Sequence, residues 1–205
     1  MKKIMIAITG ASGVEIGVKL IEHLVATEGF QISISISKNG HIVCNSELGS
    51  NYMELIQKQG VLCYQYDDFN CPYASGSALN EGMVISPCSM GTLGRIANGI
   101  SSNLIERAAD VCIKEKRKLV LVIRELPLSN IHLENMLKLS LSGVVIESQR
   151  AAKGEMMVLT LCSRCERDFR DSGYVLVKKG WQETKEDCDF CKVKQGLNFG
   201  VFGSP

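Results

Sequence analysis

The stretch KIMIAITGASG, residues 3–13, decides how the fold begins. Its first seven residues are mostly apolar and suit a β-strand, and GASG at 10–13 then supplies a tight turn. Helical spacing of apolar residues follows over 15–26, and residues 31–36 (QISISI) alternate polar and apolar side chains. A strand, a glycine turn, a helix and a second strand in this order predict the opening of a parallel α/β sheet.

The alternation of strands and helices continues along the chain. Further apolar strands are predicted at 82–87, 119–123 and 143–146. Further helices are predicted at 40–48, 52–58, 89–98, 103–115 and 131–140. Residues 60–80 are rich in Asn, Asp, Pro, Gly and Ser and are expected to be irregular. The pattern predicts a Rossmann-like, doubly wound parallel sheet of the α/β class over residues 1–147.

The bulk composition narrows the classes of protein that the chain can belong to. Its 205 residues suffice for one α/β domain and a small appendage. A net charge of +1 offers no basic field for nucleic acid, and no apolar run is long enough to span a bilayer. The N-terminal apolar stretch runs straight into the glycine turn, which is unlike a signal peptide. We therefore expect a cytoplasmic protein with no nucleic-acid or membrane partner.

Small and hydroxyl-bearing residues gather where three of the predicted strands end. The junctions are GASG at 10–13, Ser37-Lys38, and the tetrapeptide SMGT at 89–92. In an open parallel sheet such junctions share the edge at which ligands bind, and helix N-termini there bind phosphate through backbone N–H groups. A lone GASG is often only a tight turn, but three such junctions predict a phosphate-bearing cofactor. The full G-x-G-x-x-G fingerprint is absent, which favours a mononucleotide over a dinucleotide.

A cluster of charged residues lies near the predicted strands at 82–87 and 119–123. Its members are Arg107, Lys114, Arg124 and Glu125. Arg124-Glu125 directly follows the apolar strand at 119–123, so both residues are expected at the ligand-binding edge. An arginine there can clamp a phosphate, and a neighbouring carboxylate can carry a proton. A surface ion pair is the competing interpretation.

Seven ordered motifs resemble the flavin prenyltransferase family (UbiX-type). They are GASG at 10–13, ISK at 36–38, ASGS at 74–77, GMVISPCSMGTL at 82–93, NLIERAADV at 103–111, IKEKRKLVLVIRELPL at 113–128 and IHLENMLKL at 131–139. The resemblance runs from residue 3 to about 146. Flavin-dependent cysteine decarboxylases of related fold resemble the chain less in the RAADV and RELPL motifs.

The resemblance implies a Rossmann-like flavoprotein that forms a homo-oligomer, either a trimer or a dodecamer. Members of the family bind FMN and transfer a dimethylallyl group from dimethylallyl phosphate to N5 and C6 of the reduced flavin, without a metal. The prenylated FMN then serves a partner decarboxylase. The implied function of this chain is therefore that of a flavin prenyltransferase.

The resemblance also implies which residues form the site. Those implied to hold FMN are Gly10, Ala11, Ser12, Ser37, Ser89, Met90, Gly91, Thr92, Arg107 and Arg124. Those implied to be catalytic are Ser12, Glu47, Lys114, Arg124 and Glu125. Ser12 would lie near the flavin N5, and Glu47 would take part in proton handling. The last three would surround the prenyl phosphate, partly across a subunit boundary, and would stabilise and protonate the departing phosphate.

The sequence departs from the family pattern at two places. Val14-Glu15-Ile16 stands where the family has an aromatic or small residue after GASG. After the fifth predicted strand, residues 147–150 (ESQR) replace a Pro-rich segment ending in Phe-Tyr, which supplies a tyrosine and a basic residue to the prenyl-phosphate site. The alternative hypothesis is a homologue that binds FMN but prenylates it poorly or not at all, and acts as a flavin carrier or interaction module.

Two C-x-x-C pairs mark a different C-terminal segment. The cysteines are Cys162, Cys165, Cys188 and Cys191. Such spacing predicts a tetrahedral zinc site, with a redox dithiol pair or a rubredoxin-like iron site as alternatives. Residues 148–156 are expected to be a linker and 157–205 a zinc-ribbon-like segment, too small to fold without a metal. Met156-Met157 could be a former start codon, so the segment could be a fused reading frame.

Overall fold

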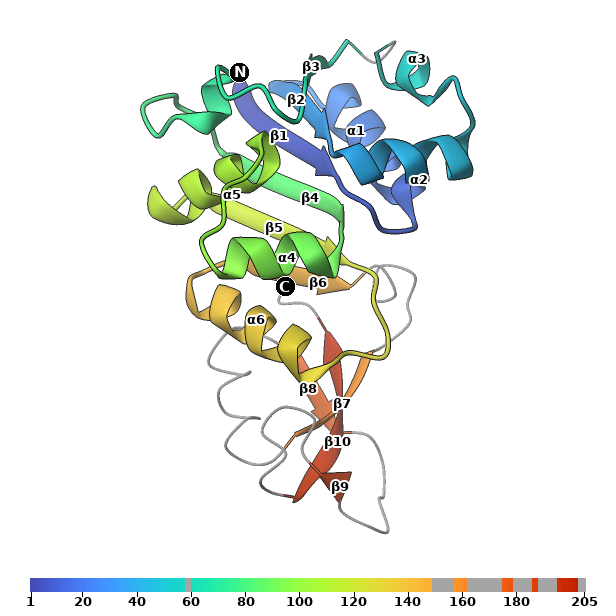
Figure 1. The fold of residues 1–205 in the computed structure, drawn as a ribbon, viewed down its shortest axis with the longest axis vertical. Helices are drawn as coiled ribbons and strands as arrows, with labels where there is room; N and C mark the ends of the chain where they lie inside the picture. The colour runs from blue at the N-terminus through green and yellow to red at the C-terminus, as the bar shows by residue number, and fades with distance from the viewer. Residues whose placement is uncertain (58–59, 149–156, 162–174, 179–185, 188–194, 203–205) are drawn as a thin grey trace.

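Six parallel strands form the central sheet of the computed structural model, which describes residues 1–57, 60–148 and four short strands beyond them (Figure 1). The strands are β1 (Lys2–Ile8), β2 (Phe30–Ile36), β3 (Leu62–Tyr64), β4 (Gly82–Cys88), β5 (Lys118–Ile123) and β6 (Val145–Ser148). Their order in the sheet is β3-β2-β1-β4-β5-β6. The direction of winding reverses between β1 and β4, and ligands of open α/β sheets bind at the carboxyl ends of strands at such a reversal.

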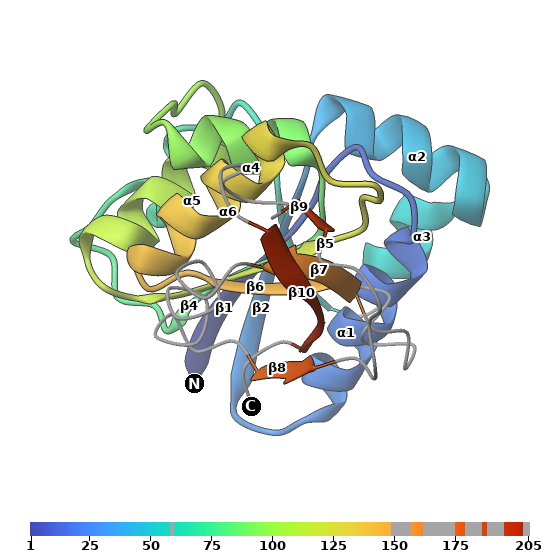
Figure 2. The ribbon, with the colours of Figure 1, turned by 90° about the horizontal axis from the view of Figure 1, so that it is seen from below.

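Helices cover both faces of this sheet. They are α1 (Val14–Ala26), α2 (Lys38–Leu48), α3 (Tyr52–Gln57), α4 (Met90–Ala97), α5 (Leu104–Lys114) and α6 (Asn130–Leu141), with a 3₁₀ turn at Pro72–Ala74. Helix α1 lies on one face, and α4, α5 and α6 lie on the other (Figure 2). None of the helices in the described part of the chain is long and apolar enough to cross a bilayer.

The apolar character of the strands follows from this two-sided cover. Residues 5–8 of β1 are each 0% exposed, because β1 lies in the middle of the sheet. Met5 and Met83 belong to the core under α4–α6, whereas Ile6 and Ile21 belong to the core under α1. Strands buried on both faces need continuous apolar runs rather than strict alternation, and β1 and β5 have such runs. Strand β2 differs, because it alternates isoleucines with the buried hydroxyls of Ser33 and Ser35.

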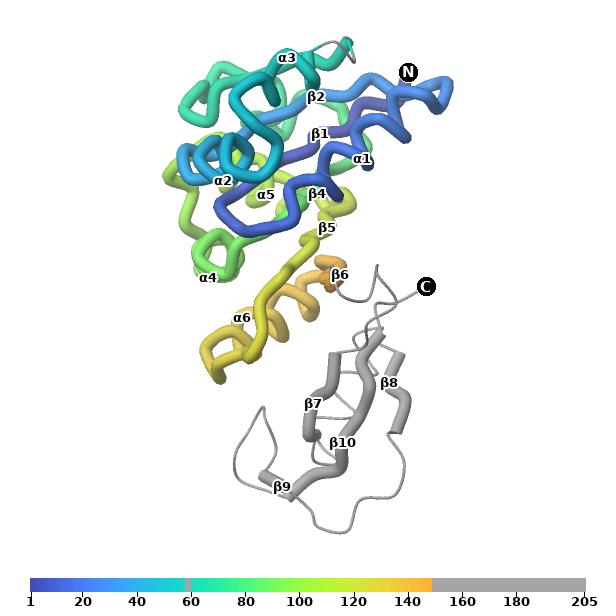
Figure 3. The backbone as a smooth tube through the Cα atoms, turned by 90° about the vertical axis from the view of Figure 1, so that its right-hand side faces the viewer, coloured from blue at the N-terminus to red at the C-terminus, as the bar shows by residue number. Residues whose placement is uncertain are grey.

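Two glycines let helices approach the strands closely. A Cβ at Gly17 of α1 would overlap the carbonyl oxygen of Ser86, and one at Gly40 of α2 would lie 2.6 Å from the carbonyl oxygen of Ile8. The backbones of α1 and α2 therefore pack directly on the carboxyl-terminal parts of β4 and β1. Figure 3 shows the backbones of α1 and α2 beside the strands of the sheet.

The predicted α/β fold class is confirmed, and each helix predicted over residues 1–147 is present. The expectation that residues 60–80 are irregular is wrong for β3, which pairs with β2. This edge strand has only three residues, and Leu62 and Cys63 are exposed, so it carries no period that sequence patterns could detect. Strand β6 runs to Ser148, one residue beyond the predicted boundary at 147.

Four short strands are described in the C-terminal segment. They are β7 (Met157–Leu161), β8 (Val175–Lys178), β9 (Glu186–Asp187) and β10 (Gln195–Phe202). All three partners of β10 pair with it in the antiparallel sense. The four cysteines predicted to bind zinc lie outside the described residues.

Candidate active site at the carboxyl edge of the sheet

Thr9 joins the ends of β1 and β4. Its backbone N–H donates to the carbonyl oxygen of Pro87 at 3.1 Å, and its hydroxyl donates to the same oxygen at 2.9 Å. The hydroxyl oxygen also accepts the N–H of Ser89 at 2.8 Å. Thr9 is only 1% exposed, so these bonds are shielded from water. They hold the GASG turn beside the start of α4, where the winding of the sheet reverses.

Three helix N-termini open at this edge. Gly13 precedes α1 with a φ of 90°, a conformation that favours glycine. Ser37 caps α2 by accepting the N–H of Gly40 at 3.0 Å, and Ser89 caps α4 by accepting the N–H of Thr92 at 3.3 Å. The predicted FMN-binding junctions are thus brought to one edge, where helix dipoles favour negative charge.

The N-terminus of α1 holds the carboxylate of Glu47. The N–H of Gly13 donates to Glu47 Oε1 and Oε2 at 3.0 and 2.9 Å, and the N–H of Val14 donates to Oε2 at 3.1 Å. These contacts show that the end of α1 accepts anionic oxygens through its backbone. They also place Glu47, from the end of α2, beside the GASG turn that carries Ser12.

A polar pocket of about 240 Å³ unites the ends of β1, β5 and β6. It is lined by Ser12, Arg124, Glu125, Leu126 and Ser148. Within the described residues, the Arg124 and Glu125 side chains have no hydrogen-bond or ion-pair partner, and both residues are exposed. They do not form the ion pair that the competing interpretation required. A guanidinium and a carboxylate without partners in this part of the chain, beside a hydroxyl, can bind a phosphate and move a proton.

A second cluster, which we call the basic turn cluster, comprises Arg107, Lys114 and Arg117 around the turn 74–77. Arg107 Nε donates to the carbonyl oxygen of Ala74 at 3.1 Å, and Arg117 Nη2 donates to that of Gly76 at 2.6 Å. Arg107 also pairs with Asp110 at 2.7 Å, and Lys114 pairs with Glu115. None of these residues lines the polar pocket.

Strand β5 separates the two clusters within one chain. Lys114 precedes the strand and Arg124 follows it, and six extended residues span about 20 Å. The predicted catalytic residues therefore fall into separate groups. The pocket is shared by Ser12, Arg124 and Glu125. Glu47 lies at the N-terminus of α1. Lys114 lies towards the opposite edge of the sheet.

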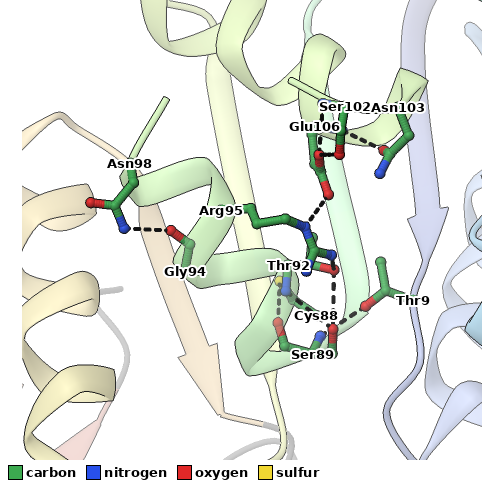
Figure 4. Close-up of polar contacts among 10 residues, drawn as sticks. All are labelled: Thr9, Cys88, Ser89, Thr92, Gly94, Arg95, Asn98, Ser102, Asn103 and Glu106. Carbon is green, nitrogen blue, oxygen red and sulfur yellow. Dashed lines mark hydrogen bonds and ion pairs between the residues drawn. The ribbon is translucent and has the colours of Figure 1, made fainter. Parts of the chain in front are cut away.

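Sequence reasoning missed Thr9, Arg95 and Glu106, which form polar contacts behind the α4 N-terminus (Figure 4). Thr9 is the last residue of an apolar stretch and gave no signal of its own. Arg95 and Glu106 lie on different helices, eleven positions apart, and no helical spacing joins them. Among the described residues, no group of three or more His, Cys, Asp or Glu could hold a metal.

The sequence matches the Flavoprotein family over residues 1–168. It is 46% identical to the flavin prenyltransferase UbiX of Halalkalibacterium halodurans, over 69% of this chain and 72% of that protein. It is 44% identical to the flavin prenyltransferase UbiX of Methanocaldococcus jannaschii, over 70% of this chain and 77% of that protein.

Solved structures agree with the sequence comparison. A crystal structure of AnUbiX with FMN and dimethylallyl pyrophosphate superposes with a TM-score of 0.67 at 37% identity, over 71% of this chain and 76% of that chain. A dodecameric FMN-dependent UbiX-like decarboxylase from Escherichia coli O157:H7 gives 0.68 at 38% identity, over 71% and 79%. The family expected from the motifs is thereby confirmed. This chain belongs to the flavoprotein family and, within it, to the UbiX flavin prenyltransferases.

Proposed function

We propose that this chain transfers a dimethylallyl group from dimethylallyl phosphate to reduced FMN, and so makes prenylated FMN for a partner decarboxylase. The observation that carries the proposal is the polar pocket, which Arg124 and Glu125 line together with Ser12, and in which neither charged side chain has a partner among the described residues. Relatives with 44–46% identity are flavin prenyltransferases, which supports the same reaction here.

The carboxyl edge fits FMN by the chemistry of its donors. The N-termini of α2 and α4, capped by Ser37 and Ser89, open at this edge, and helix N-termini bind phosphate oxygens through backbone N–H groups. The residues proposed to hold FMN are Gly10, Ala11, Ser12, Ser37, Ser89, Met90, Gly91, Thr92 and Arg124. Bound FMN supplies the N5 and C6 atoms to which the prenyl carbons become joined.

The pocket residues have complementary tasks in this reaction. Cleavage of the allylic C–O bond leaves the electron pair on a phosphate oxygen. Arg124 stabilises that developing negative charge, and Glu125 delivers a proton to the departing phosphate. Ser12, on the GASG turn, would orient the reacting edge of the flavin, and Glu47 beside that turn would accept a proton that the flavin loses as the new bond forms.

We propose that a neighbouring subunit completes the site. Lys114 was expected beside Arg124 at the prenyl phosphate, and Arg107 was expected to hold FMN, but β5 separates both residues from the pocket within one chain. A homo-oligomer, trimeric or dodecameric, would bring the basic turn cluster of one subunit to the pocket of the next. The dodecameric state of the Escherichia coli relative supports this arrangement.

The test is anaerobic incubation of the purified protein with reduced FMN and dimethylallyl phosphate, followed by mass spectrometry of the released flavin. Dimethylallyl pyrophosphate serves as the comparison donor. A mass gain of one prenyl unit supports the proposal. Tightly bound flavin of unchanged mass with both donors contradicts it.

One observation favours a second candidate function. In three of the relatives the similarity spans 69–74% of this chain and 72–82% of the relative, so each relative has a part that the match does not cover. If that part contributes to the prenyl-phosphate site, this chain binds FMN and acts as a flavin carrier or interaction module. Unmodified FMN that remains bound through purification is the expected result for this candidate.

We further propose that Cys162, Cys165, Cys188 and Cys191 bind one zinc ion. The two C-x-x-C pairs support this site, and the antiparallel strands between and around them are compatible with a ribbon. Elemental analysis of the purified chain is expected to give about one zinc per chain, and Cys188→Ser is expected to lower that content. Iron, or no metal together with a reducible disulfide, would contradict the proposal.

A further inference from the structure

Glu106 is a buried carboxylate that anchors an arginine behind the α4 N-terminus (Figure 4). It is 1% exposed and lies in the first turn of α5. It accepts hydrogen bonds from the backbone N–H of Ser102 at 2.9 Å and from the hydroxyl of Ser102 at 2.5 Å. It also forms an ion pair with Arg95 Nε. Three donors around one carboxylate leave it little freedom to move.

The carboxylate is held in its charged form. Burial raises the pKa of Glu106, but the hydrogen bonds from Ser102 and Arg95 outweigh burial and hold the pKa below its ordinary value. A charged and immobile carboxylate fixes the guanidinium of Arg95 in both position and orientation, because a guanidinium binds carboxylates in a planar, directional manner.

The other end of the guanidinium contacts the turn that is proposed to bind FMN. Arg95 Nη2 donates to Thr92 Oγ1 at 3.3 Å, and the hydroxyl of Ser89 donates to the same oxygen at 3.0 Å. A hydroxyl has two acceptor positions and one hydrogen. Both acceptor positions of Thr92 are filled, and its hydrogen has no acceptor among the described residues. That hydrogen remains available to an anion at the α4 N-terminus.

The guanidinium lies over the first turn of its own helix. A Cβ at Gly91 would meet Arg95 Nη1 at 3.4 Å, so the absence of a side chain there gives the guanidinium room. A cation at a helix N-terminus is repelled by the helix dipole. Glu106 offsets that repulsion, and it is the reason why Arg95 can turn back towards Thr92.

We infer that Arg95, anchored by Glu106, is a positioning residue that presets the Thr92 hydroxyl to donate to the phosphate of FMN. The inference rests on the proposed function and extends it to two residues outside the polar pocket. Thr92 touches the ligand, whereas Arg95 and Glu106 act through it.

The test compares the affinities of the apoprotein for FMN and for riboflavin, which lacks the phosphate, by quenching of flavin fluorescence. Wild type is expected to bind FMN more tightly than riboflavin. Arg95→Ala, Glu106→Gln and Thr92→Val are each expected to weaken FMN binding about tenfold and leave riboflavin binding unchanged. Lys138→Ala, which removes another cation that contacts α4 through Asn98, is the matched control and should keep the wild-type preference.

Each other outcome has a distinct meaning. Equal loss of FMN and riboflavin affinity would assign a merely structural role to the pair and overturn the inference. If Arg95→Ala loses affinity for FMN and Glu106→Gln does not, Arg95 contacts the phosphate directly. That outcome also overturns the inference. If Glu106→Gln does not fold, Arg95→Lys takes its place, since it keeps the charge but loses the fork that reaches Thr92. A wild type without preference for FMN would instead contradict the proposed function itself.

Discussion

Three side chains from distant parts of the sequence determine what the pocket can do. Ser12 follows β1, whereas Arg124 and Glu125 follow β5, and the pocket joins them because both strands end at the same edge. Arg124 provides a fixed positive charge, and Glu125 provides a group that can gain or lose a proton. Arg124 is therefore suited to bind the phosphate, and Glu125 is suited to protonate it.

Glu125→Gln is expected to separate flavin binding from prenyl transfer. The amide keeps the size of the side chain but cannot deliver a proton, so the rate of prenylation should fall about 100-fold. The affinity for FMN should stay within about twofold of wild type, because no charge-assisted contact to FMN is assigned to this residue. Prenylated flavin is followed by mass spectrometry over time. Glu134→Gln, an exposed carboxylate on α6, is the control. Unchanged rates in Glu125→Gln would remove it from the mechanism.

Glu106→Gln is expected to lower the free energy of unfolding at neutral pH by about 1–3 kcal/mol, since charged hydrogen bonds are lost. The pKa of Glu106 is lowered in the fold, so its contribution to stability is complete above the ordinary pKa of glutamate. That contribution disappears as the pH falls through the lower, folded-state value.

Urea unfolding at a series of pH values measures the difference in the free energy of unfolding between wild type and Glu106→Gln. The gap between wild type and Glu106→Gln should narrow towards acid pH, whereas Glu54→Gln, exposed on α3, should show no such gap. A gap that is independent of pH would mean that the carboxylate charge does not stabilise the fold.

At the scale of elements, the site depends on how closely helices pack on strands. Helix α1 contacts β4 through Gly17, and this contact sets the position of the GASG turn relative to Ser86. Helix α4 contains a second interior glycine, Gly94, whose added Cβ would meet only Asn135 Nδ2 at an ordinary 3.5 Å. Both glycines lie in the interior of a helix, but they differ in the space available for a side chain.

Gly17→Ala and Gly94→Ala are therefore expected to have opposite effects on stability. The first places a methyl group against the backbone of β4 and should destabilise the fold by about 1–3 kcal/mol. The second should stabilise it by about 0.5–1 kcal/mol, because alanine favours helix interiors over glycine. Thermal unfolding monitored by circular dichroism measures both. If Gly17→Ala leaves the stability unchanged, α1 does not pack on β4 as described.

At the scale of the whole molecule, the two clusters of charged residues lie towards opposite edges of one sheet. The basic turn cluster lies before β5, and the polar pocket lies after it. A rigid six-residue strand cannot shorten to bring them together. In the proposed arrangement, a second copy of the chain places its Lys114 near Glu125, and closed homo-oligomers allow such an exchange between identical subunits.

Mixed oligomers test this arrangement. Lys114→Ala and Glu125→Gln should each be nearly inactive alone. Coexpressed, they should recover activity, because roughly a quarter of the shared sites would combine the two intact residues if subunits mix at random. The prenylation rate of the mixture is compared with that of each variant. As a control, the variants are mixed after purification without subunit exchange. No recovery in coexpressed oligomers would mean that each chain supplies its own residues.

The amino-acid sequence by itself determined the order of the elements and the chemistry available at their junctions. The apolar runs in β1, β4 and β5, and the hydroxyls that follow β2 and β4, predict strands, turns and a phosphate-bearing ligand. Such local features depend on residues a few positions apart, so their spacing is enough to reveal them. The three-residue β3 was missed because it is too short to show a period.

Only the tertiary structure decided which of these residues meet. The bond from Ser89 to Thr9 joins positions 80 residues apart, and Glu47 reaches Gly13 from 34 residues away. The pairing of Arg95 with Glu106 depends on how α4 packs beside α5. The separation of Lys114 from Arg124 likewise follows from the direction and length of β5. These relations arise from the order of strands in the sheet and the packing of helices on it, which no local spacing encodes.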